Sequence, residues 1–153
     1  MTGLVLLAVA ALTGAPLSEL NGDWRSVGER PIRVSYRSIS NDLATVEQWR
    51  TPSGRETMTV YTVDGPSMLA THYCGQGNVA TLGAPMATKE LDFSFREARG
   101  VDPGEGVLVR LRLVRDGERL RRIETYRNGF RDSTEVIEFV RETSNQARRP
   151  FVA

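Results

Sequence analysis

Residues 56–78 read ETMTVYTVDGPSMLATHYCGQGN, two strand-like runs separated by an Asp-Gly-Pro-Ser turn. Runs rich in β-branched and aromatic residues on either side of such a turn predict a β-hairpin, which here ends in a glycine-rich loop. The second run holds the only histidine and the only cysteine of the chain, His72 and Cys74. They are two residues apart, so on a strand both side chains point to one face. We therefore expect any chemical centre to include this hairpin.

Similar runs continue on both sides of the hairpin and are separated by turn residues at the spacing typical of all-β domains. Leu91, Phe93 and Phe95 alternate with polar residues, the pattern of a half-buried strand. No amphipathic helix of useful length interrupts the runs, which favours an antiparallel meander. Closing the meander removes its edge strands. The sequence thus predicts an all-β, antiparallel up-and-down barrel of nine or ten strands, wide enough to hold one small ligand. The runs are 22–26, 32–37, 44–50, 56–63, 68–74, 89–96, 107–114, 120–127 and 134–140, with 79–84 as a short strand or loop.

One hairpin, built around an Asp-Gly pair, has two possible registers. A two-residue turn places Arg112 opposite Arg121, whereas a three-residue loop pairs Arg110 with Glu124. We prefer the second register because like charges directly opposite each other are destabilising. It puts Arg122 and Glu124 on the face of Arg110 and Arg112. We expect that face to be solvated, since charged residues are rarely buried; if it lined the lumen instead, these residues would belong to a site.

The charge and the cysteine and histidine content of the chain limit the classes of function that we expect. The chain has 153 residues and a formal net charge of +1, which fits one domain and indicates neither nucleic acid nor an anionic membrane as a partner. A lone cysteine cannot form an intramolecular disulfide. One histidine and one cysteine fall short of the usual zinc ligand set, so we expect no metal site.

The first residues have the form of a signal peptide. An apolar run over residues 4–12 is followed by small residues and then Pro16. The run resembles the apolar region of a secretory signal peptide and is too short to span a membrane. We therefore expect a signal peptide at 1–15, a barrel domain at 16–141 and a polar tail at 142–153. The expected location is outside the cytoplasm, in a periplasm.

Gly22 and Trp24, on the first expected strand after a short helical turn, resemble the Gly-x-Trp signature of lipocalin-like (calycin) barrels. The segments 47–49, 55–61 and 71–78 resemble a group of uncharacterised exported bacterial lipocalin-like proteins, and the likeness runs from Gly22 to Arg141. The resemblance implies that the first-strand tryptophan packs at the closed end of the barrel. It also implies a basic residue over the indole, supplied by either Arg127 or Arg141.

The resemblance makes haem a candidate cofactor, because nitrobindins are calycin-type barrels that bind it through one histidine located late in the chain. Here the late strands from residue 107 to 140 contain no histidine. We therefore expect no cofactor.

The function that follows is binding of a small apolar or amphipathic molecule in the barrel. The sequence does not indicate the oligomeric state. Two alternatives stay open. One is an enzyme in which His72, with Cys74 or Glu47, does acid–base chemistry, although no triad or dyad is recognisable and no catalytic residue is assigned. The other is a filled barrel that serves structure or protein interaction. The candidate ligand-binding residues are His72, Cys74, Met58, Val60, Met68, Phe93, Phe95 and Tyr61.

Overall fold

The computed structural model describes residues 17–29, 31–86 and 90–143. The expected signal peptide at 1–15 and most of the expected tail lie outside these residues. One 3-10 turn precedes ten strands. The elements are η1 (Ser18–Leu20), β1 (Gly22–Ser26), β2 (Arg33–Ile39), β3 (Ala44–Arg50), β4 (Glu56–Asp64), β5 (Ser67–Tyr73), β6 (Val79–Pro85), β7 (Glu90–Arg99), β8 (Val107–Asp116), β9 (Arg119–Asn128) and β10 (Arg131–Arg141).

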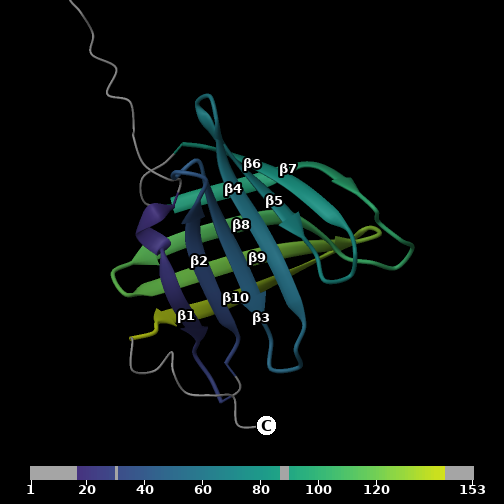
Figure 1. Cartoon of the computed structure of the whole chain (residues 1–153). Helices are drawn as coiled ribbons and strands as arrows, with labels where there is room; N and C mark the ends of the chain where they lie inside the picture. The colour runs from purple at the N-terminus through teal and green to yellow at the C-terminus, as the bar shows by residue number, and fades with distance from the viewer. Residues whose placement is uncertain (1–16, 30, 87–89, 144–153) are drawn as a thin grey trace, which may run out of the picture.

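The ten strands form a closed antiparallel barrel in which each strand pairs with its neighbours in sequence and β1 pairs with β10. Figure 1 shows β1 to β5 in front of the lumen and β8 to β10 behind it. The predicted up-and-down barrel of nine or ten strands is confirmed. No helix among the described residues is long and apolar enough to cross a membrane.

The end of the barrel where β1 begins is closed. The Trp24 side chain is fully buried there, and its Nε1 donates to the carbonyl of Leu20 in η1 at 2.8 Å. The Arg141 guanidinium lies 4.2 Å from the centre of the Trp24 ring and donates to the carbonyl oxygens of Asn21 and Glu19. Of the two basic residues that the resemblance allowed, Arg141 covers the indole. The other, Arg127, pairs with Asp132.

Gly22 has a structural reason to be glycine. Its φ is +133°, and a Cβ built on it would lie 2.8 Å from the Nη1 atom of Arg141. Any side chain at this position would therefore combine an unfavourable backbone conformation with a collision against the cation that closes the barrel.

The opposite end of the barrel has an incomplete seam. β7 and β8 pair only from Glu90 to Ser94, although both strands continue toward this end. Phe95 lies opposite the fully buried Leu82, which puts it on the inward face, yet 44% of it is exposed. The loop that joins β7 to β8 is held over this end by Asn78, whose Nδ2 donates to Glu105 and to the carbonyl of Gly106. We call this the loop end of the barrel.

The register of the β8–β9 hairpin corrects the sequence prediction. Asp116 pairs with Arg119 around a two-residue turn, and Gly117 occupies the first turn position with a φ of +58°. This geometry suits the primed turns that join twisted strands. The pairing differs by one residue from the preferred register, and a one-residue slip exchanges the faces of a strand. Arg122 therefore lies opposite Leu113, on the inward face.

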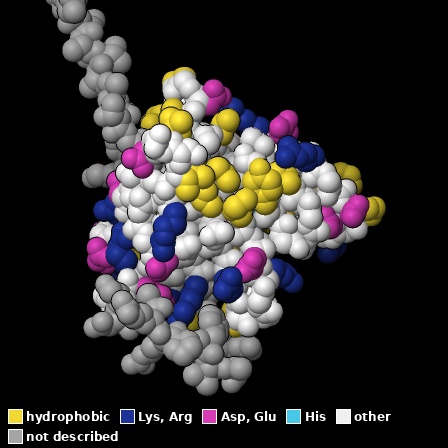
Figure 2. Space-filling model, in the orientation of Figure 1, with side chains coloured by type: hydrophobic (Ala, Val, Ile, Leu, Met, Phe, Trp, Pro, Cys, Tyr) yellow, Lys and Arg dark blue, Asp and Glu magenta, His cyan; other side chains and the backbone are white. Residues whose placement is uncertain are grey.

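The outward face of the barrel is mixed. Arg110 and Arg112 are on this face, as expected, and they pair with Asp92 and Glu90 of β7. Figure 2 shows charged side chains spread over one side of the barrel, around an apolar patch. Half-buried apolar side chains on the outward faces of β3, β4 and β5 include Val46, Val60 and Leu69.

Candidate functional site: a polar cluster in the lumen

An ion-pair cluster crosses the lumen. Arg122 of β9 donates through Nη1 to Glu47 of β3 and through Nε to Glu124, and all three side chains are buried. Burial alone lowers the pKa of Arg122, but the two carboxylates outweigh it, so its pKa lies above the ordinary range. The guanidinium is thus permanently charged and shared by two acids.

Two further side chains donate hydrogen bonds to Glu47, and a third lies near it. Trp49 Nε1 donates to one carboxylate oxygen at 2.8 Å, and the Tyr61 hydroxyl donates to the other at 2.7 Å. The Tyr36 hydroxyl is buried near Glu47, though without a hydrogen bond of standard geometry. Burial, with the nearby Glu47 charge, raises the pKa of both tyrosines, so they stay protonated. The Arg122 guanidinium also lies 4.7 Å from the centre of the Trp49 ring, a cation–π contact.

His72 lies above this cluster, toward the loop end. Its Nδ1 is 3.0 Å from the Thr59 hydroxyl of β4, and its Nε2 is 3.5 Å from the Tyr126 hydroxyl of β9. Burial and, secondarily, the Arg122 charge lower its pKa to about 4. The imidazole is therefore neutral at pH 7. Both ring nitrogens are directed at hydroxyl groups, so neither is directed at Cys74.

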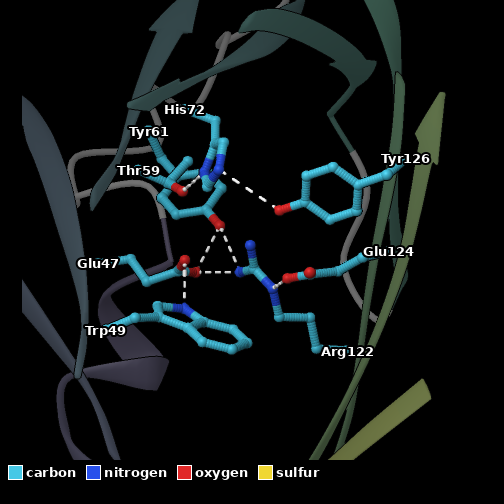
Figure 3. Close-up of polar contacts among 8 residues, drawn as sticks. All are labelled: Glu47, Trp49, Thr59, Tyr61, His72, Arg122, Glu124 and Tyr126. Carbon is cyan, nitrogen blue, oxygen red and sulfur yellow. Dashed lines mark hydrogen bonds and ion pairs between the residues drawn. The ribbon is translucent and has the colours of Figure 1, made fainter. Parts of the chain in front are cut away.

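One strong donor of the cluster has no partner. Arg122 is 1% exposed, and its Nη2 atom makes no hydrogen bond. Figure 3 shows this nitrogen pointing away from Glu47 and Glu124, toward the space between His72 and Tyr126. A buried unpaired donor is costly, and in native proteins it usually bonds to water or a ligand. The three groups around this space can hold an oxygen atom.

The predicted site residues separate into three groups. Met68, His72, Phe93 and Tyr61 are buried on the inward face. Along β4, Tyr61 alternates with Met58 and Val60, so it faces the opposite side of the sheet from them. It is Tyr61, however, that faces the lumen.

The placement of Met58 and Val60 in the lumen was therefore wrong. Met58 pairs with exposed Gln48 and exposed Tyr73, and Val60 pairs with Val46 on the same outward face. The error followed from assuming an apolar lumen, whereas β4 turns Thr59 and Tyr61 inward. Phe95 reaches the loop end, and Cys74 is half-buried in the loop that follows β5.

Arg122 and Glu124 were expected on a solvated face and assigned to a site only if that face lined the lumen, and both are buried inside the barrel. Tyr126, Thr59 and Asn78 were not predicted as site residues. On β9, the sequence does indicate that Arg122 faces inward. Arg122 lies two residues after Leu120, which is buried, so the two side chains share one face of the strand. An apolar residue two positions away predicts an inward face. The expectation that charged residues avoid burial overrode that signal.

A groove of about 730 Å³ lies on the outside of the barrel. One wall is a row of cross-strand partners on the outward faces of β1 to β5; the row is Asp23, Ser35, Gln48, Met58 and Tyr73. The groove is also lined by Val34 and Trp49, and Trp49 donates to Glu47 of the polar cluster.

In the part of the chain that the structure describes, no three His, Cys, Asp or Glu side chains are grouped so as to hold a metal ion. No protein-family model and no curated protein matches this chain. The resemblance to exported lipocalin-like proteins therefore stays a prediction.

Proposed function

We propose that the barrel binds a small amphipathic molecule at the loop end of the lumen, with an oxygen acceptor of the ligand on Nη2 of Arg122. The observation that carries this proposal is the unpaired, buried Nη2 beside His72 and Tyr126. A ligand oxygen there would gain a charge-assisted hydrogen bond, about twice as strong as a neutral one.

The rest of the ligand would extend toward the loop end. Phe95 presents an exposed aromatic ring on the inward side of the incomplete β7–β8 seam, and Tyr126 is only half-buried. Exposed apolar surface beside a few convergent polar groups is typical of small-molecule sites. The polar cluster favours an amphipathic ligand over a purely apolar one, because an apolar molecule would leave Nη2 unpaired.

Binding of octane-1,2-diol, a neutral probe with oxygen acceptors and an apolar tail, tests the proposal by native mass spectrometry and calorimetry. Tyr126→Phe removes only a hydroxyl from the site and is expected to weaken binding about fivefold to tenfold. Tyr73→Phe, on the exposed outward face, is the matched control and should bind like the wild type. Loss of binding in both variants, or in neither, contradicts the proposed site.

A further inference from the structure

The charge of the lumen and a second unpaired atom indicate the class of ligand. Among the described residues, the charged residues of the lumen cluster that are buried as a whole are Glu47, Arg122 and Glu124. Two carboxylates face one guanidinium, so the cluster carries one formal negative charge when all three are ionised. His72 adds none at pH 7, because its pKa is lowered to about 4.

Asn78 supplies a buried acceptor at the loop end. It is 1% exposed and lies two residues before Ala80, so it shares the inward face of that fully buried residue. Its Nδ2 is used by Glu105 and Gly106, which fixes the orientation of the amide. Its Oδ1 has no hydrogen-bond partner.

The two unpaired atoms belong to one region. A Cβ built on Gly106 would lie 3.8 Å from Cβ and Cδ1 of Tyr126, so the Asn78 contact with Gly106 is near the backbone end of Tyr126. The hydroxyl end of the same ring is beside His72, next to the space that Nη2 faces. One side of the region thus offers a donor and the other offers an acceptor.

We infer that the ligand is an amphipathic amine with a neighbouring hydroxyl or carbonyl oxygen. The oxygen accepts from Nη2 of Arg122, and the ammonium donates to Oδ1 of Asn78. A cation also offsets the negative charge of the buried cluster, which an anion would increase. The rings of Tyr126 and Phe95 at the loop end add surfaces that attract cations. This inference depends on the proposed function and adds the charge of the ligand to it.

A matched eight-carbon series tests the inference by calorimetry on the whole protein. The probes are 2-aminooctan-1-ol, octane-1,2-diol and 2-hydroxyoctanoic acid. We expect the amino alcohol to bind at least about tenfold more tightly than the hydroxy acid. Equal binding of these two, or tighter binding of the acid, overturns the inference while octane-1,2-diol binding still supports the proposed function. If none of the three binds, the proposed function itself fails.

Two variants distinguish the effect of a carboxylate in the lumen from that of a carboxylate on the surface on the preference for the amine over the acid. Glu124→Gln removes the excess negative charge and should reduce the preference for the amine over the acid at least about threefold. Glu138→Gln changes an outward-facing glutamate that lies opposite Arg121 in the β9–β10 register, so it should leave the preference unchanged. A preference that changes equally in both variants, or in neither, contradicts the inference. Circular dichroism checks that both variants fold.

Discussion

Glu47 and Arg122 form an ion pair across the lumen although 75 residues separate them in the chain. Glu47 comes from β3 and Arg122 from β9, so the pair ties together opposite sides of the barrel. It also holds Trp49 and Tyr61, which both donate to Glu47. Stability and the proposed site therefore depend on the same contact.

Glu47→Gln should be strongly destabilising, because it leaves a buried guanidinium without one of its two counter-charges. We expect a loss of about 3–5 kcal/mol in the free energy of unfolding, measured with denaturant. Glu56→Gln is the control, since its ion pair with Arg50 is exposed and should contribute at most about 1 kcal/mol. Equal effects of the two variants would show that the buried pair has no special role.

Gly22→Ala tests the closed end. Gly22 and Gly28 have similar positive φ values, +133° and +137°, but only Gly22 has a neighbour, Arg141, within collision distance. The Gly28→Ala control therefore carries the backbone cost alone. We expect Gly22→Ala to lower the melting temperature further, by an amount equivalent to at least about 1 kcal/mol. If the two variants lower the melting temperature equally, the Arg141 side chain can move away from the added methyl group at no cost, which contradicts this expectation.

Arg141→Met tests which cation covers Trp24. The substitution removes a cation–π contact and two hydrogen bonds, one to Glu19 in η1 and one to Asn21 directly after it, so we expect a loss of about 1–2 kcal/mol in the free energy of unfolding. Arg127→Met removes an exposed, solvent-screened pair with Asp132 and should lower the free energy of unfolding much less. A larger loss in the Arg127 variant would reverse the assignment.

The single histidine allows a clean pH test. The folded-state pKa of His72 is lowered from 6.5 to about 4, so the unfolded chain binds the proton more readily. The stability that neutral His72 contributes to the folded protein is therefore fully present above pH 6.5. It is lost as the pH falls from 6.5 toward 4. His72 should contribute about 3 kcal/mol to this loss.

His72→Gln should remove that part of the pH dependence between 6.5 and 4. Proton NMR of the wild type reports the ring directly. An imidazole that titrates near 6.5 in the folded protein would contradict the burial and the contacts given to His72.

The barrel was predictable from the sequence because alternation and turn residues are local signals. Leu91 and Phe93 face inward as their alternation indicates. The polar cluster was not predictable in the same way. Each buried charge is stabilised by partners from distant strands, as Arg122 is by Glu47, and no local pattern shows which pairs meet. Predicting the cluster also requires the correct register of the β8–β9 hairpin. A shift of one residue in that register decides whether the Arg122 side chain faces the lumen or the solvent.

The central claim is that the lumen binds a small molecule over Arg122. Native mass spectrometry of wild-type protein, purified without denaturation and titrated with 2-aminooctan-1-ol and octane-1,2-diol, tests it most directly. We expect a saturable one-to-one complex whose extra mass is lost on unfolding. A protein that keeps its apo mass at millimolar probe, with a folded circular dichroism spectrum, would contradict the claim and favour the filled barrel.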